Sequence, residues 1–132
     1  QCNCGNKGCF EVYCSKKKFK EQMQKILGIT EYVGAADLTK AVEENMNNDD
    51  VKNLLEEYVD NLALGIANII NILEPEARSI GGSMSHYEKL IFGRLKEKIY
   101  SGEYLFNKEN PPKILTAQAG NDAGIVGATL IS

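Results

Sequence analysis

The sequence predicts an α/β domain built around one long amphipathic helix, and three observations lead to this fold class. Apolar residues recur at helical spacing across residues 51–73. Two short apolar segments, residues 77–80 and 113–117, indicate strands. Each is followed by glycine and a further helical pattern, the second of which covers residues 123–130. A long helix accompanied by alternating strands and helices is typical of a layered α/β domain.

The N-terminal residues 1–14 contain every cysteine of the chain, and their spacing predicts a metal site. Thiolates that recur at such short intervals are not ordinary core residues, and Gly5 and Gly8 allow the tight turns that would aim several sulfurs at one point. Soft thiolate ligands in a tetrahedral arrangement are characteristic of zinc. The cysteines are Cys2, Cys4, Cys9 and Cys14.

The sequence leaves two questions about this cluster open. A pair of disulfides is the alternative to zinc, although disulfide-rich domains usually spread their cysteines along the chain. If Cys2, Cys4 and Cys9 bind zinc, the fourth ligand is either Cys14 or a group that this chain does not supply. The single histidine, His86, is distant in sequence and is expected to cap a helix or lie exposed at its start.

Two predicted helices follow the cysteines. Ser15 is expected to cap a helix that runs to about residue 27, and Asp37 to cap a short helix over residues 38–45. The polar run at residues 45–50 predicts a loop that supplies the next N-cap. The buried face of the first helix is expected to contain Phe19, Met23, Ile26 and Leu27.

The central helix is expected to span residues 51–73 and to end before Pro75. At ~1.5 Å per residue it would be roughly 33 Å long. Its second side is slim, because Ala63, Gly65 and Ala67 are small, and this predicts close packing against another element. The expected apolar stripe comprises Val51, Leu54, Leu55, Tyr58, Leu62, Ile66, Ile69, Ile70 and Leu73.

A glycine pair follows the first predicted strand. Gly81 and Gly82 predict a turn that leads into a helix over residues 86–100, with Ser85 and Glu88 as a capping box. A strand, a glycine turn and a helix N-terminus form the geometry in which backbone N–H groups approach a nucleotide or phosphate. On these residues alone, a tight turn without a ligand is the simpler explanation.

Length, composition and charge limit the function classes. A chain of 132 residues forms one domain, or half of a larger one. The net charge of −3 provides no basic surface for nucleic acid. Residues 61–73 are too few and too polar to cross a bilayer, and the polar start contains no secretory signal. We therefore expect a cytoplasmic protein without a membrane partner, and, because Gln1 leads straight into the cysteines, a fragment of a longer one.

Three separated segments resemble one family, the ROK sugar kinases and repressors. Residues 2–15 are similar to the family's zinc motif, C-x-C-G-x-x-G-C-x-E, with its following tyrosine and serine. Residues 73–82 resemble its P-E stretch and the glycine-rich turn after a strand. Residues 120–128 are similar to its C-terminal motif, G-x-x-A-G-x-x-G-A. The resemblance covers essentially the whole chain.

The resemblance implies a fold and a set of ligands. The fold would be the C-terminal half of a two-domain, ribonuclease-H-like protein of the actin and hexokinase superfamily. Residues 1–14 would be a zinc-binding loop and residues 15–132 the helical and αβ body. Cys2, Cys4 and Cys9 would bind a structural zinc ion together with a histidine that lies upstream in the family.

The resemblance also implies roles for three further residues. Glu11 would contact the sugar, since a carboxylate accepts hydrogen bonds from two vicinal hydroxyls. Gly81 and Gly82 would lie against the nucleotide. Cys14 stands where the family usually has a small residue other than cysteine.

The activity implied is that of a kinase that phosphorylates a hexose or N-acetylhexosamine with ATP and magnesium, and we expect it to be a homo-oligomer. The family's phosphate-binding segment and catalytic aspartate have no counterpart in this chain, which is therefore expected to be inactive alone. The alternatives are a sugar-responsive ROK repressor with a preceding DNA-binding segment, and a small zinc-binding interaction domain.

Overall fold

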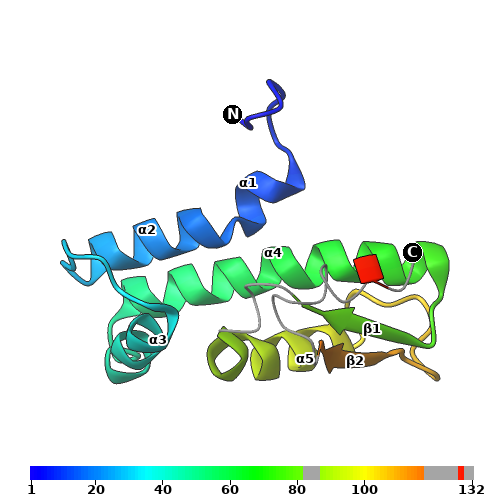
Figure 1. The fold of residues 1–132 in the computed structure, drawn as a ribbon. Coiled ribbons are helices and arrows are strands. Elements are labelled where there is room, and N and C mark those ends of the chain that lie inside the picture. Colours follow the sequence, from blue (N-terminus) through cyan, green and yellow to red (C-terminus); the bar gives the residue numbers. More distant parts are fainter. Residues whose placement is uncertain (82–86, 118–127, 130–132) are drawn as a thin grey trace.

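One long helix, α4, runs through the molecule, and the other elements lie along it (Figure 1). The computed structural model describes residues 1–81, 87–117 and 128–129. In chain order the elements are α1 (Phe10–Cys14), α2 (Lys16–Ile26), α3 (Ala35–Glu44), α4 (Asp49–Leu73), β1 (Ala77–Ile80), the π-helical turn η2 (Glu88–Phe92), α5 (Gly93–Tyr100) and β2 (Lys113–Thr116). The predicted α/β class is confirmed at this level.

The ends of α2 and α4 follow from their sequence. The Ser15 side chain accepts a hydrogen bond from the backbone N of Lys18 at 3.4 Å, and Gly28, at φ +67°, lies just beyond the end of α2. The Asn48 side chain accepts from the backbone N of Asp50 at 2.9 Å, which caps α4 within the predicted loop. The helix has 25 residues, so it is roughly 37 Å long.

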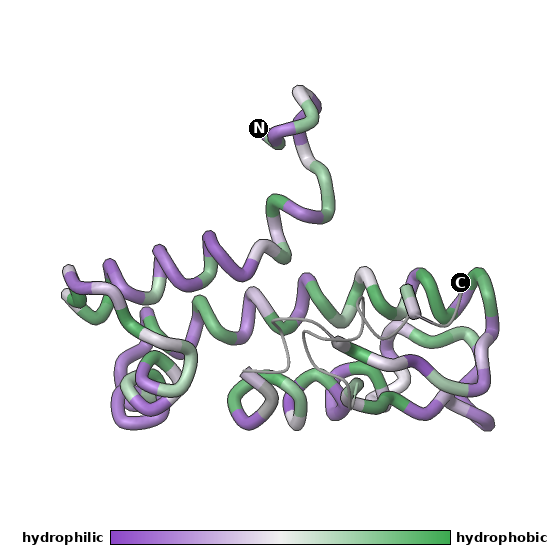
Figure 2. The backbone as a smooth tube through the Cα atoms, in the orientation of Figure 1, coloured by the Kyte–Doolittle hydropathy of each residue, from purple (hydrophilic) through white to green (hydrophobic). Residues whose placement is uncertain are grey.

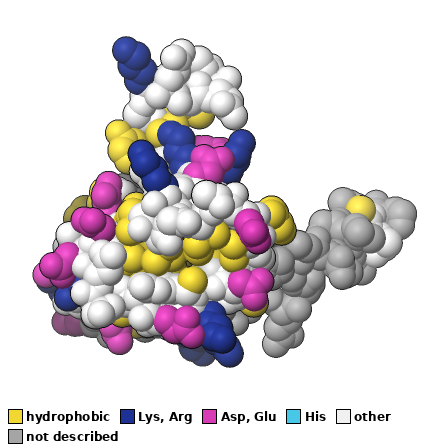
Figure 3. All heavy atoms as spheres, turned by 90° about the vertical axis from the view of Figure 1, so that its left-hand side faces the viewer, with side chains coloured by type: hydrophobic (Ala, Val, Ile, Leu, Met, Phe, Trp, Pro, Cys, Tyr) yellow, Lys and Arg dark blue, Asp and Glu magenta, His cyan; other side chains and the backbone are white. Residues whose placement is uncertain are grey.

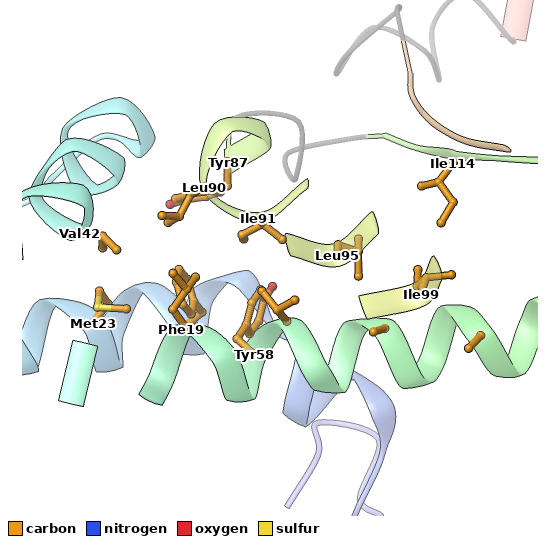
Figure 4. Close-up of a cluster of buried hydrophobic side chains, with 14 of the residues drawn as sticks. Phe19, Met23, Val42, Tyr58, Tyr87, Leu90, Ile91, Leu95, Ile99 and Ile114 are labelled. Carbon is orange, nitrogen blue, oxygen red and sulfur yellow. The ribbon is translucent and has the colours of Figure 1, made fainter. Parts of the chain in front are cut away.

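The hydrophobic core lies between α4 and the elements packed against it. Phe19 of α2 stacks on Tyr58 of α4 with ring centroids 4.5 Å apart, and its ring meets Tyr87 edge to face at 6.2 Å. Figure 4 shows that Tyr87, Leu90 and Ile91 approach the rings of Phe19 and Tyr58 from the opposite side. Hydrophilic residues cover much of the outer side of α2, away from this core (Figure 2).

The buried face of α4 is turned slightly from the predicted stripe. Its buried residues are Val51, Leu55, Tyr58, Val59, Ala63, Ala67 and Ile70. Near the C-terminal end, Ile69 and Leu73 are 46% and 64% exposed, so their assignment to the buried stripe was wrong. The small residues Ala63 and Ala67 are buried instead, because a slim face lets α5 approach the helix closely.

The two predicted strands form a parallel pair in which Ala77 is opposite Lys113 and Ile80 is opposite Thr116. Ile114 on β2 is buried, so this face of the pair packs toward the helices (Figure 4). The predicted capping box at the start of helix 86–100 and nearly all of the predicted helix 123–130 lie outside the residues that the structure describes.

Three other elements differ from their predictions. Residues 10–14 form α1 instead of continuing the N-terminal loop. Helix α3 begins at Ala35 after Gly34, so Asp37 lies in its first turn and is not the N-cap. The helix expected up to residue 100 opens with a π-helical turn, η2, before α5. None of the described helices has the length and apolar character needed to cross a membrane.

Candidate metal centre and adjoining carboxylate

The N-terminal cysteines lie on a tight backbone knuckle that stands clear of the helical body (Figures 1 and 3). The backbone N of Cys2 donates to the carbonyl of Asn6 at 2.8 Å, and the N of Gly5 donates to the carbonyl of Cys2 at 3.0 Å. Gly5 and Gly8 have φ of +88° and +75°, a conformation that side chains disfavour. The predicted use of these glycines as turn residues is therefore confirmed.

The knuckle brings three sulfur atoms together. The Sγ atoms of Cys2, Cys4 and Cys9 all lie within 4.8 Å of one another, and those of Cys4 and Cys9 are 3.5 Å apart. Zinc–sulfur bonds of ~2.3 Å at tetrahedral angles would separate two sulfurs by about 3.8 Å. The cysteine cluster therefore fits a zinc ion with small side-chain adjustments, and its donor set is one that zinc prefers.

The electrostatics of the cluster favour one thiolate beside a thiol. The backbone N–H of Asn6 and the thiol of Cys9 stabilise the charged form of Cys4 and lower its pKa to about 7. The same hydrogen bond from Cys9 to Cys4 raises the pKa of Cys9, because it stabilises the protonated form of the donor. A cluster that holds a thiolate near neutral pH is suited to a cation, since metals bind the deprotonated sulfur.

Cys14 does not belong to the cluster. It lies at the C-terminal end of α1, outside the set of sulfurs within 4.8 Å of one another. Partial burial raises the pKa of Cys14 to about 11, so its thiol stays protonated at neutral pH. Of the two possibilities for a fourth ligand, the geometry disfavours Cys14.

Glu11 lies directly beyond the cluster, in the first turn of α1, and its side chain is exposed. Cys9 is the N-cap residue of this helix, so a ligand of the cluster and the carboxylate belong to consecutive parts of one short element. An exposed carboxylate there is accessible to a polar ligand. Its predicted contact with a sugar stays a prediction.

Two contacts that the sequence analysis did not identify attach α1 to α4. The ring of Phe10 occupies the space in which a Cβ atom on Gly65 would lie. The hydroxyl of Tyr58 donates a hydrogen bond to the carbonyl of Cys14 at 3.0 Å. The slim side of α4 predicted close packing, and Gly65 confirms it, but only the fold reveals that Phe10 is the partner.

Gly81, the first of the two predicted nucleotide glycines, lies just beyond the end of β1. Gly81 is exposed, and a Cβ added there would lie 3.0 Å from the Cβ of Ala117, just beyond β2. Glycine therefore lets the ends of the two strands approach each other. Gly82 lies outside the described residues.

A further cavity lies away from the cysteine cluster. It has a volume of about 460 Å³ and sits where α4 ends and the strands begin. Its polar lining includes Asn71, Glu74 and Lys113, and it contains none of the predicted site residues. The side chain of Asn71 is already engaged there, because it donates to the carbonyl of Tyr104 at 2.7 Å and accepts from the N of Phe106 at 3.0 Å.

Comparisons with known proteins agree with the motif analysis. A model of the ROK family matches residues 1–132. An N-acetyl-D-glucosamine kinase of Aliivibrio fischeri is 29% identical over 132 residues, which are 100% of this chain and 41% of that protein. The N-acetyl-D-glucosamine kinases of Vibrio cholerae and Vibrio parahaemolyticus are 29% and 30% identical, over 99% and 98% of this chain and 41% of each relative. The chain thus spans about two-fifths of the length of these relatives.

Proposed function

The chain belongs to the ROK family, and we propose on this basis that it is the sugar-binding and zinc-holding part of an ATP-dependent sugar kinase. The observation that carries the proposal is the convergence of Cys2, Cys4 and Cys9 immediately before the exposed Glu11. The relatives named above are kinases of N-acetyl-D-glucosamine, so we propose an N-acetylhexosamine or hexose as the substrate, with N-acetyl-D-glucosamine first. A ROK repressor is the less favoured alternative.

In this proposal the zinc ion is held by Cys2, Cys4 and Cys9 and has a structural role. When bound, it would fix the knuckle and supply no reaction chemistry. The residues of this chain that act on it are the three thiolates and the Asn6 backbone N–H, which favours the charged form of Cys4. The fourth ligand would come from outside this cluster, and a histidine is the natural candidate.

Glu11 would bind the sugar. Its carboxylate accepts hydrogen bonds only, so it suits two neighbouring hydroxyl donors on a pyranose ring. Because the side chain is exposed and the helix that carries it is attached to α4, the carboxylate is accessible and held in place. Hydrogen bonds to a charged group are worth about 1.5–3 kcal/mol each, so losing one of them should weaken sugar binding roughly 10- to 100-fold.

ATP and magnesium belong to the complete protein in this proposal. Gly81 and Gly82 would lie against the nucleotide, since glycine lets a backbone approach a phosphate or base closely. We assign no general base to a residue of this chain, and we expect the chain alone to be inactive. The predicted homo-oligomer and cytoplasmic location are part of the same proposal.

The test is ADP release by the full-length protein over a panel of hexoses and N-acetylhexosamines. Glu11→Gln removes the charge but keeps the shape, and it should raise KM for the sugar roughly 10- to 100-fold. Glu43→Gln is the matched control, because Glu43 is an exposed glutamate on α3, distant in sequence from the cluster. No turnover with any sugar would contradict the kinase proposal, and equal KM values for the two variants would contradict the role of Glu11.

A further inference from the structure

We propose that Gly65 and Phe10 form a positioning contact that sets where α1 lies on α4, and thereby places both Glu11 and the cysteine cluster. This inference rests on the proposed sugar and zinc site. It adds two residues that would touch neither ligand. Neither Phe10 nor Gly65 has an assigned role at the site in the predictions made from the sequence.

The first argument is the fit between the two residues. The Cε2 and Cζ atoms of Phe10 lie where a Cβ atom on Gly65 would be. A side chain at position 65 would therefore push the ring away. Glycine inside a helix is destabilising by roughly 0.5–1 kcal/mol relative to alanine, so its place in the interior of α4 calls for such a close approach.

The second argument is that Phe10 contributes little to the core. Its side chain is 51% exposed, in contrast to Phe19, which is 1% exposed. A ring that is half in solvent gains only part of the free energy of burial. Its specific contribution is the location of α1 against one residue of α4.

The third argument is a second contact that attaches α1 to the same face of α4. The hydroxyl of Tyr58 donates to the carbonyl of Cys14, at the other end of α1. Tyr58 and Gly65 are seven positions apart on α4, so they lie two turns apart on one face of the helix. The two ends of α1 are thus attached to positions two turns apart on one face of a rigid helix.

The connection to the site is covalent. Cys9 directly precedes Phe10, and Glu11 directly follows it. A helix of five residues is far too short to be stable alone, so its position comes from the contacts with α4. Any shift of Phe10 therefore moves a zinc ligand and the sugar carboxylate together.

Gly65→Ala is the informative variant. Alanine improves the helix propensity of α4, so the body should stay folded with an unchanged or slightly raised melting temperature. The methyl group displaces Phe10, and α1 with it. We expect KM for the sugar to rise at least ~10-fold with kcat within about twofold, because Glu11 binds the sugar equally in the ground and transition states. Zinc affinity should fall about 10- to 100-fold, as for other changes just outside a metal's ligands.

Two further variants separate positioning from a general loss of stability. Gly93→Ala is the matched control, since among the described residues no atom lies within 4 Å of the Cβ position at this helical glycine, apart from its chain neighbours and the backbone of its own helix. Phe10→Leu supplies the rescue, because a smaller side chain leaves room for the methyl group introduced at position 65. Phe10→Leu should weaken zinc and sugar binding in the wild-type background and improve both in the Gly65→Ala background.

The deciding experiment follows the full-length protein by amide hydrogen exchange over residues 10–14, chelator competition for zinc and sugar kinetics. Faster exchange in α1 of Gly65→Ala, if it is reversed by Phe10→Leu and absent in Gly93→Ala, supports the positioning contact. A wild type that binds no zinc and phosphorylates no sugar would overturn the proposed function alone and leave this exchange result valid. If Gly65→Ala has the same exchange rates, zinc affinity and KM as the wild type, the inference is overturned and the proposed function stays intact.

Discussion

The assignment of the zinc ligands is tested most directly by two serine substitutions in the same short segment. Cys9→Ser removes a sulfur of the cluster, whereas Cys14→Ser removes the cysteine that lies outside it. Both changes replace sulfur by oxygen in a side chain of similar exposure class, since Cys9 and Cys14 are each partly buried. The two variants therefore make the same chemical change, and only one of them changes the sulfur cluster.

The expected difference in zinc affinity is large. A structural zinc site contributes on the order of 10–16 kcal/mol, and loss of one of four ligands should remove about a quarter of this, or roughly 3 kcal/mol. This corresponds to a ~100-fold weaker zinc complex for Cys9→Ser. For Cys14→Ser we expect unchanged zinc affinity and a change in unfolding free energy of less than about 1 kcal/mol, because it adds no unpaired charge and leaves no large cavity.

The assay is zinc content after purification in reducing buffer without chelator, followed by competition with a chelator of known affinity. The wild type and Cys14→Ser should each retain one zinc ion per chain, and Cys9→Ser should lose most of it under competition. Loss of zinc from Cys14→Ser with retention by Cys9→Ser would refute the assignment. Absence of zinc from all three proteins would refute the metal site itself.

Three further predictions concern the thiols, the core and the surface. In metal-free protein, alkylation of Cys4 should have its midpoint near pH 7, because its pKa is lowered to about 7. Cys14, whose pKa is raised to about 11, should react only in strong alkali, and mass spectrometry of samples alkylated across a pH series checks both. Leu55→Ala leaves a cavity at a fully buried position and should lower the unfolding free energy by about 2–5 kcal/mol, measured by urea unfolding. An unchanged urea midpoint would contradict the core described above. Lys98→Met removes the ion pairs with Glu56 (3.6 Å) and Asp60 on a partly exposed surface, so it should lower the unfolding free energy by only about 0.5–1 kcal/mol. A destabilisation that persists in ~1 M salt would argue against an ionic origin.

The fold was predictable where a local rule decides the outcome. Helical periodicity identified α2 and α4. Cap chemistry located the start of α2 at Ser15 and the cap of α4 within residues 45–50, where the structure has Asn48. Short apolar runs with flanking Pro and Gly gave β1 and β2 within one residue. Their parallel pairing could not be derived from these runs, because it depends on where α5 carries the chain.

The failures occurred where tertiary contacts override local signals. Residues 10–14 form a helix only because Phe10 and Cys14 are attached to α4, and five residues show no periodicity that could be recognised. At Ile69 and Leu73 the apolar spacing was correct for a helix, but the face that is buried was set by the close approach of neighbouring elements to small residues.

The convergence of the cysteines was predictable from the sequence, but the contacts that support the cluster were not. The spacing of Cys2, Cys4 and Cys9 and the turns at Gly5 and Gly8 were sufficient to predict convergence of the sulfurs. Exclusion of Cys14 required its burial at the end of α1 to be known. The role of Gly65 required the position of Phe10, which lies far away in sequence and close by in space.

The parallel arrangement of β1 and β2 has a consequence for the order in which the chain folds. Parallel neighbours must be joined by a crossover, and here η2 and α5 form it, so the strands lie at the two ends of a long return path. Strand pairing must wait until the crossover has docked on α4, because only then has the entropy of the large loop between the strands been lost. The strand pair is therefore expected to assemble after α5 has docked and to open before α5 separates from α4, so Gly81 lies at the end of the β1–β2 unit that unfolds first.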